Sequence, residues 1–456
     1  MMADEPECLF RTRQRWVSAA LIGAVIFCLP WTFSGANVFI AIAALSGAVT
    51  LFETPSGWRW LAHVFGAGFA ILLVGFCATF FLTLLFSPVE PPDFGSAREI
   101  KWVFLLLCIP LIGAVLEHDW RKAGRLLWVR AAVAAFVGVV LTVVAVGTVQ
   151  FTTGQLTRVD VDVSSYPRAH GFFSNPIPFA HVAGAGFFFL IPFAMMIGKR
   201  CDRRFLSATT IALFVALLIL AWAVFASVSR GSVGALLATF LISVVFGLRG
   251  RPGVAMILVV TMGLVSAVVL TASPSAWDRL VVNFDSETWG KNPRYAMWRA
   301  NWEMVSDYPW GIGYGNNLSI REEYFEELGL PAEKMVKHAH QEFLEVLVGT
   351  GWIGFFFFSA LVAWVTWRGL RVYTWLCRRN AHGLAALALG AVLSNIYLHG
   401  CAMTDQIDSP SRIILVLASG LILTLDSGRR LIERGDVEGR CEGLRLWARG
   451  FSARLR

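Results

Sequence analysis

Apolar segments of about 20 residues recur along this sequence from one end to the other, separated by mostly short polar connections. A helix needs about 20 apolar residues to cross the hydrocarbon core of a bilayer. Runs that reach or approach this length lie at 16–34, 36–53, 60–86, 101–117, 128–150, 171–198, 205–226, 231–248, 253–272, 342–367, 383–403 and 411–426. The sequence therefore predicts an all-α polytopic integral membrane protein with about 12 transmembrane helices.

The composition excludes several other classes of protein. Hydrophobic residues make up 56% of the chain and charged residues 15%, whereas soluble domains have about 45–50% apolar and about 25% charged residues. A disordered chain, a soluble enzyme and a secreted disulfide-rich scaffold are therefore excluded. The eight cysteines include no C-x-x-C pair, so they are predicted to be small buried hydrophobic residues.

Lys and Arg are concentrated on alternate connections, which predicts the orientation of the chain. With a cytoplasmic N-terminus, the cytoplasmic segments hold about three times as many of them as the short external ones. The net charge of +8 therefore indicates orientation rather than nucleic-acid binding. The first run continues to Ser34 without a small-x-small cleavage site, so it is predicted to be a signal anchor. Both termini are expected in the cytoplasm, with a basic tail on anionic lipid.

One connection is much longer than the others. About 70 residues with charges of both signs and many aromatic side chains separate the ninth apolar run from the tenth. Long connections without a function are uncommon, so we expect the chemistry here. The predicted organisation is transmembrane helices over 1–272, a periplasmic loop domain with short helices over 273–341, transmembrane helices over 342–426 and the cytoplasmic tail over 427–456.

Two motifs predict local structure in this loop. Residues 293–302 read PRYAMWRANW, and their aromatic side chains follow helical spacing, which predicts an amphipathic helix that can lie on the membrane surface. Residues 308–317 read YPWGIGYGNN, and alternate glycines permit either a close backbone approach to a ligand or simply a tight turn. A short acidic helix is expected over 320–334.

Two histidines stand where the loop meets the tenth apolar run, in KHAHQEFLE over 337–345. His338 or His340 is a candidate general base for a hydroxyl nucleophile, because a histidine with an ordinary pKa near 6.5 can accept a proton at neutral pH. His338 and Glu342 share a helical face if the helix starts that early. A metal site is a weaker alternative, since the pattern is not H-E-x-x-H and no third soft ligand is evident. A purely amphipathic role for the histidines also stays open.

Two external arginines are candidate anion-binding residues. Arg168 precedes the sixth apolar run, and Arg230 lies in the SVSRGS break over 227–232. An arginine at the bilayer boundary is costly unless it is paired or binds an anion, and its guanidinium fits phosphate oxygens bidentately. The alternative is pairing with external carboxylates such as Asp405, Asp408 or Glu90. Arg412 either belongs with these anion-binding arginines or extends its side chain to the membrane interface, and the sequence leaves both open.

These motifs, taken in order, carry a resemblance to a known family. They are the Ser-Arg-Gly hairpin at 229–231, Arg-x-x-x-Trp at 294–298, the Pro-Trp-Gly-x-Gly-x-Gly turn at 309–315, His-x-His-x-x-x-Leu-Glu at 338–345 and GTGWIG at 349–354. In this order and on one face, the sequence resembles the O-antigen ligase/polymerase superfamily over about 165–360. Family members commonly show His-Asn where this chain has His340-Gln341.

The resemblance implies glycosyl transfer from an undecaprenyl-pyrophosphate-linked glycan to a sugar of lipid A–core, at the periplasmic face of a bacterial inner membrane. It implies that Arg168, Arg230 and Arg294 neutralise the pyrophosphate and that His338 or His340 takes the acceptor proton. Arg299 and Glu342 are expected to support the acceptor or the loop. No metal, cofactor or nucleotide sugar is implied. If the base and the arginines lie on opposite sides of the sugar, the transfer would invert the configuration of the anomeric carbon.

Three alternatives remain. A ligase is favoured over a polymerase because polymerases of this superfamily often carry two sizeable external loops, whereas the earlier loop here, 150–170, is short. A secondary transporter for a small anion is allowed by the number of spans, but few ionisable residues fall in them, chiefly His63, His181 and His399. A scaffold that binds a partner protein through the aromatic loop is the third.

Overall fold

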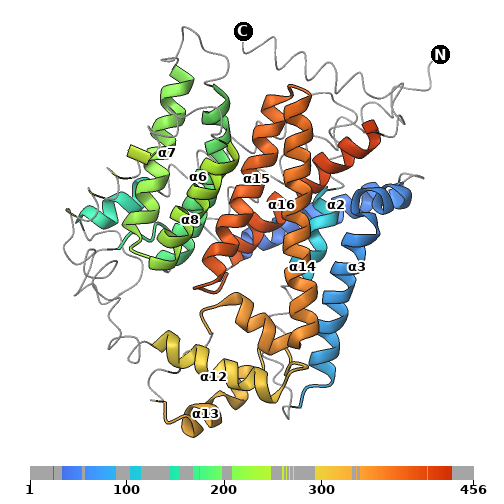
Figure 1. The fold of residues 1–456 in the computed structure, drawn as a ribbon, viewed down its shortest axis with the longest axis vertical. Helices are drawn as coiled ribbons and strands as arrows, with labels where there is room; N and C mark the ends of the chain where they lie inside the picture. The colour runs from blue at the N-terminus through green and yellow to red at the C-terminus, as the bar shows by residue number, and fades with distance from the viewer. Residues whose placement is uncertain are drawn as a thin grey trace.

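The computed structural model describes residues 33–53, 57–88, 103–113, 144–153, 168–173, 175–197, 208–247, 293–330, 339–407 and 409–433, with a few isolated positions between them. Regular structure within these residues is helical throughout (Figure 1). The helices are α2 (Phe33–Glu53), α3 (Gly57–Leu85), α6 (Pro176–Ile197), α7 (Ala208–Ala226), α8 (Arg230–Gly247), α12 (Pro293–Asp307), α13 (Asn317–Glu327), α14 (Glu342–Arg378), α15 (His382–Ala402) and α16 (Ser409–Glu433). Residues 103–113 and 144–153 are also helical.

Five of the described helices are long and apolar enough to cross a membrane, which confirms a helical membrane protein. They are Gly68–Leu85 of α3, Pro176–Met195 of α6, α14, α15 and Pro410–Arg430 of α16. The described residues alone do not show the predicted number of about 12 spans. Apolar helices at Val103–Gly113, Thr210–Ala226 and Arg230–Val245 are shorter, and the predicted spans 16–34 and 253–272 fall almost entirely outside the described residues.

The helices form two groups joined by α15. Figure 1 shows α6, α7 and α8 on one side and α3, α14 and α16 on the other. Against α6, α15 packs closely: Tyr397 donates a hydrogen bond to the carbonyl of Ala180 at 2.9 Å, and Ser394 donates to Ala185 O at 2.8 Å. Many of the residues of α15 are alanine or glycine, and small side chains allow helix backbones to approach each other within a membrane.

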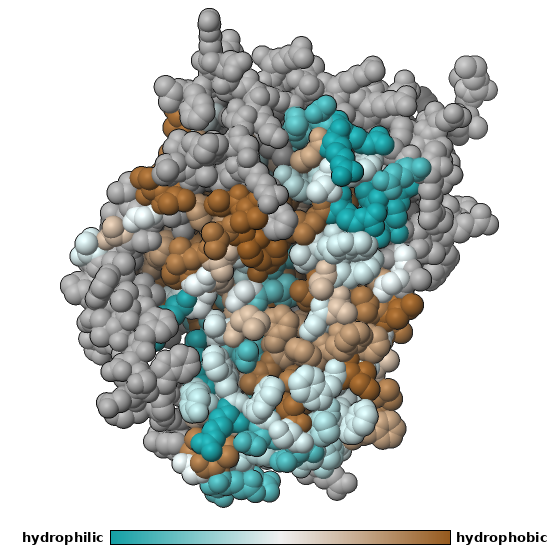
Figure 2. All heavy atoms as spheres, viewed as in Figure 1, coloured by the Kyte–Doolittle hydropathy of each residue, from teal (hydrophilic) through white to brown (hydrophobic). Residues whose placement is uncertain are grey.

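The loop helices lie at one end of these two groups. Figure 1 places α12 and α13 together beyond the N-terminal end of α14. In Figure 2, hydrophilic residues gather at this end and near the opposite end, and the surface between them is largely apolar. The predicted amphipathic helix is confirmed as α12, whose apolar face packs on the first turns of α14. The shared buried cluster comprises Ala296, Met297, Ala300, Met304, Leu344, Leu347 and Val348.

Of the three aromatic residues on which that helix was predicted, Trp298 packs against the buried cluster. Tyr295 is 44% exposed and Trp302 54% exposed, so most of the core contacts of α12 are made by alanine and methionine. Burying one such methionine stabilises by about 1.5–3 kcal/mol. The predicted acidic helix over 320–334 starts and ends earlier than expected, as α13.

The glycine-rich turn packs on a break in α14. Gly351 interrupts that helix with φ +65°, a conformation that is unfavourable for residues with a side chain. Across the break, Ile312 N donates to Val348 O at 3.1 Å and Gly313 N donates to Gly349 O at 2.9 Å. The sequence left open a close backbone approach to a ligand or a tight turn, and the structure has the turn. The glycines permit its backbone to approach that of α14.

At the opposite end, α14 and α16 extend beyond their apolar runs. Residues 427–433 of the predicted tail are helical, because Asp426 of α16 is fully buried and pairs with Arg368 of α14. The rest of that tail, from 434 onward, is outside the described residues.

Candidate functional site

Arg168 and Arg230 flank the turn between α7 and α8. Arg168 Nε donates to the carbonyl of Ser227 at 2.9 Å, and the next residue, Ala169, donates its N–H to Ala226 O at 2.9 Å. Arg230 is the first residue of α8. The turn holds itself together, since Ser229 N donates to Ser227 Oγ at 3.2 Å. Both arginines therefore lie at one end of the α7–α8 pair.

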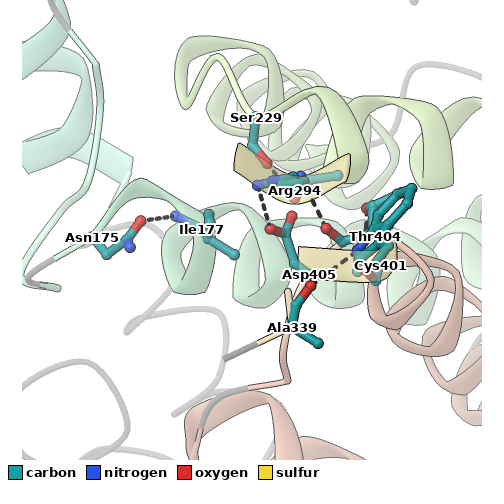
Figure 3. A network of polar contacts seen from close by, with 10 residues as sticks. Asn175, Ile177, Ser229, Arg294, Ala339, Cys401, Thr404 and Asp405 are labelled. Carbon is teal, nitrogen blue, oxygen red and sulfur yellow. Dashed lines mark hydrogen bonds and ion pairs between the residues drawn. The ribbon is translucent and has the colours of Figure 1, made fainter. Parts of the chain in front are cut away.

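Arg294, at the start of α12, reaches the end of α15. Its Nη2 lies 2.6 Å from Asp405 Oδ1, and its Nη1 donates to Thr404 O at 2.9 Å (Figure 3). The Asp405 side chain is 1% exposed and that of Arg294 is 34% exposed. A buried carboxylate therefore fixes this arginine, and the arginine still presents part of its surface to solvent.

Gly231 brings the two arginine-bearing segments together. A Cβ at Gly231 would collide with the side chain of Thr404 and would lie 3.0 Å from Asp405 Oδ2. The residue after Arg230 is thus in contact with the carboxylate that binds Arg294. In Figure 3, Arg294 and Asp405 lie between Ser229 and Ala339. The three predicted pyrophosphate-binding arginines therefore converge on the α7–α8 turn and the end of α15.

His340 follows Ala339, a residue whose peptide groups are held from both sides. Ala339 N donates to Glu345 Oε2 at 3.0 Å, and Ala339 O accepts from Trp298 Nε1 at 2.9 Å. Trp298 lies one turn along α12 from Arg294. His340 itself has φ +52°, which costs a residue with a side chain about 1–2 kcal/mol. A partly exposed histidine in a strained conformation is a common feature of functional sites.

The carboxylate that holds Ala339 belongs to a buried network across the loop. Glu345 Oε1 accepts from Asn317 Nδ2 at 2.8 Å, and this amide also lies 3.2 Å from Asn301 Oδ1. Arg321 of α13 is fully buried. Burial lowers the pKa of Arg321, and the negative charge of Glu345 opposes that shift. Glu345 therefore links α12, α13 and the histidine segment.

Glu342 has a different set of partners from Glu345. It is fully buried, and its Oε1 accepts from Arg412 Nη2 at 3.1 Å and from the Tyr314 hydroxyl at 3.0 Å. Its Oε2 accepts from Ile407 N at 3.1 Å. Arg412, left open from the sequence, is thus a buried partner of Glu342. These contacts are those of a residue that supports the loop.

The start of α14 lies too late in the sequence for His338 and Glu342 to share a helical face. α14 starts at Glu342, with Gln341 as its N-cap, so residue 338 precedes the helix and shares no helical face with Glu342. His338 itself is outside the described residues. Arg299, the remaining predicted site residue, is exposed on α12. Within the described segments, no group of three or more His, Cys, Asp and Glu residues is arranged to hold a metal ion.

The contacts link the peptide segment of His340 to Arg294 and Asp405 in a closed path. From Ala339 the path passes to Trp298, along one turn of α12 to Arg294, then to Asp405, on to Ile407, and through Glu342 back to the histidine segment. Such an arrangement places the three arginines and His340 at the same end of the helices. It can bind a multiply charged anion and accept a proton beside it.

Sequence reasoning missed two members of this site. The sequence suggests Asp405 as a partner for Arg168 or Arg230, and the structure pairs it with Arg294, which the sequence did not suggest. Glu345 was quoted in a motif without a role. Both residues could have been found from their position, because each is a carboxylate at one end of an apolar run. A carboxylate that is buried there requires a partner.

Comparison with known families gives one match. The family model described as O-antigen ligase matches residues 213–359, which include Arg230, Arg294 and His340 and exclude Arg168 and Asp405. This match confirms the predicted family resemblance for that part of the chain. The comparison with curated proteins gives no match.

Proposed function

We propose that this protein is an O-antigen ligase that transfers a polysaccharide from undecaprenyl pyrophosphate to lipid A–core at the periplasmic face of the bacterial inner membrane. The family match over 213–359 supports glycosyl transfer with a polysaccharide and lipid substrates in general. The observation that carries the proposal is that Arg168, Arg230 and Arg294, from three separate segments, converge on the α7–α8 turn and the end of α15. Ala339, the neighbour of His340, is bound by Trp298 of the helix that carries Arg294.

In the proposed reaction the arginines bind the pyrophosphate of the donor. Negative charge develops on this leaving group as its bond to the anomeric carbon breaks, and fixed guanidinium groups stabilise that charge without reorganising. Asp405 holds Arg294 in place at 2.6 Å, so little freedom is lost when the anion binds. His340 or His338 takes the proton from the acceptor hydroxyl, and the oxygen attacks the anomeric carbon with inversion.

The remaining predicted residues act around this centre. Glu342 supports the loop through its buried contacts with Arg412 and Tyr314. Arg299 is exposed on α12 and contacts the acceptor. We retain the proposed organisation of transmembrane helices over 1–272 and 342–426, a periplasmic loop over 273–341 and a basic tail over 427–456. Both termini are placed in the cytoplasm, and the reaction needs neither metal nor cofactor.

The test is transfer by purified protein from a lipid-linked glycan to lipid A–core. Arg230→Ala, Arg294→Ala and His340→Ala are each expected to lower transfer by at least about 100-fold, as loss of one charge-stabilising group does in other enzymes. The matched control is Arg371→Ala, which removes an exposed arginine from α14 near its other end. Wild-type transfer by all three site variants would refute the proposal.

The same assay separates the two alternative functions. A polymerase would lengthen the lipid-linked glycan and leave the lipid A–core unmodified. A secondary anion transporter would accumulate its anion in proteoliposomes without glycan transfer. His181 and His399 lie in α6 and α15, and His181 contacts Ser411 through Nδ1 at 3.1 Å. This contact gives His181 a structural role. His181 is one of the few ionisable groups in the spans that a transporter would use.

A further inference from the structure

Three tryptophans form an exposed cluster where the loop meets α14. Trp302 of α12 is 54% exposed, Trp310 of the glycine-rich turn 73%, and Trp352 of α14 48%. The rings of Trp302 and Trp352 pack edge to face, with their centroids 6.4 Å apart. Trp352 N donates to the carbonyl of Pro309, the residue before Trp310, at 3.1 Å. Exposed apolar clusters of this kind mark a surface that contacts another molecule or a membrane.

The position of Trp352 along α14 places the cluster at a membrane boundary. Gly351 breaks this helix, so a new helical segment begins at Trp352. From Trp352 to Arg371 the helix rises about 28 Å, close to the hydrocarbon thickness of about 30 Å. Arg371 is exposed, and its Cζ lies 4.9 Å from the ring centroid of Trp367. Tryptophan is enriched at both membrane interfaces and arginine flanks the ends of spans, so Trp352 and Arg371 mark opposite headgroup levels.

The end of α3 reaches the same boundary. Its apolar span, Gly68–Leu85, is about 27 Å long, and Leu85 and Phe86 at its end are both 77% exposed. Ser87 Oγ then donates to the carbonyl of Ile312 in the glycine-rich turn at 2.7 Å. The turn is therefore held between the ends of two spans, at the level where each one leaves the hydrocarbon.

The tryptophan cluster is continuous with the lipid-facing surface of α14. Ile353 and Phe356 extend the exposed surface from Trp352 along the span, and neither has a hydrogen-bonding group, which a sugar would require. Tryptophan has a large apolar ring with one N–H, which suits the boundary between acyl chains and headgroups. We propose that Trp302, Trp310 and Trp352 dock the loop on the phospholipid leaflet at this end of the spans.

The docking gives the helix that carries Arg294 a second support. The apolar side of α12, which the sequence predicts at the membrane surface, is buried on α14, so Trp302 makes the lipid contact instead. Trp302 lies about 12 Å along the helix from Arg294. Contact of one end of α12 with lipid limits the movement of the other end relative to the bilayer. This docking is independent of the reaction and does not rest on the proposed function.

The experiment replaces Trp302 or Trp310 of the full-length protein with p-benzoylphenylalanine, a photoreactive aromatic residue, in nanodiscs of phosphatidylcholine. Ultraviolet light joins this residue to its neighbours, and mass spectrometry identifies the adduct. Phospholipid adducts are expected at 302 and 310 at least about tenfold more often than at 323, because tryptophan positions at the interface meet lipid and an aqueous surface does not. Glu323, the control position, is an exposed residue of α13.

Three outcomes of the cross-linking would overturn the proposal. The first is an equal yield of lipid adducts at 302, 310 and 323. The second is cross-linked pairs of this chain in place of lipid adducts, which would indicate an interface between copies. The third is adducts with a polysaccharide added to the nanodiscs in place of lipid adducts, which would indicate a glycan platform.

A second measurement uses brominated phosphatidylcholine, which quenches tryptophans that touch acyl chains. Trp310→Phe is expected to reduce the quenched emission by the share of a single tryptophan. Trp298→Phe removes a half-buried tryptophan of α12 and is expected to leave the quenched emission unchanged. Equal effects of the two substitutions would refute the lipid contact of Trp310.

Discussion

Glu345→Gln tests whether the carboxylate of Glu345 positions the histidine. Glu345 accepts one hydrogen bond on each oxygen, from Ala339 N at 3.0 Å and from Asn317 Nδ2 at 2.8 Å. Glutamine has the same shape but only one acceptor oxygen, so one of these donors would face an NH₂ group. A hydrogen bond to a charged group contributes about 1.5–3 kcal/mol. The substitution also removes the negative charge of Glu345 from the surroundings of the buried Arg321.

The Glu345→Gln substitution is expected to slow the chemical step of the transfer. Releasing Ala339 lets His340 leave its φ of +52°, and this relaxation returns about 1–2 kcal/mol to the displaced form. A cost of 1.5–3 kcal/mol corresponds to a decrease of about 10- to 150-fold in kcat. The KM for the lipid-linked donor is expected to stay unchanged, because the arginine contacts lie on other residues.

The assay is steady-state transfer with the donor and the acceptor varied separately. Glu303→Gln is the matched control, since Glu303 is an exposed glutamate on α12, and it is expected to behave as wild type. A Glu345→Gln enzyme with wild-type kcat would refute the positioning role. A rise in donor KM without a change in kcat would refute it as well, because the effect would then lie on anion binding.

Three further predictions address the site and the loop. Arg294→Lys loses the paired contact at the end of α15 and is expected to weaken donor binding by about tenfold, measured as KM; an unchanged KM would argue against this arginine as a donor contact. Glu342→Ala removes the buried carboxylate that pairs with Arg412, which is expected to destabilise by about 3–5 kcal/mol in chemical unfolding, and a loss below about 1 kcal/mol would contradict the buried pair. Gly351→Ala places a methyl group against the backbone of Trp310 and is expected to separate the turn from α14, which hydrogen exchange at Ile312 would detect; unchanged protection there would contradict the docking.

The helices in the membrane were largely predictable, because a span requires a long apolar run. The run at 383–403 corresponds to α15, His382–Ala402, and the run at 171–198 contains α6, which begins at Pro176. Proline is favoured in the first turn of a helix because its missing N–H has no partner there in any case. The five described spans follow from composition and length alone.

The ends of the helices were less predictable, because they depend on partners from distant segments. α14 was expected to stop near residue 367 and instead runs to Arg378. Arg368 reads as the start of a connection in any hydropathy profile, and only its pairing with Asp426 of α16 allows it to be buried. The position of Asp405 could not be predicted for the same reason, because its partner Arg294 lies in the distant loop. A single sequence shows charges and spacing, but not which charges meet.

The first turn of α14 connects the loop to the membrane helices and carries the histidine segment with it. Glu342 and Glu345 lie three residues apart, yet one binds Arg412 of α16 and the other binds Asn317 of α13. His340 precedes this turn by two residues, so its position depends on both groups of partners. The proposed transfer between two lipid-anchored substrates would require such coupling, because the arginines proposed to bind the donor belong partly to α8 and partly to α12. A base anchored to the loop alone would move relative to the donor whenever the loop moved, and catalysis by fixed charges depends on their staying in place.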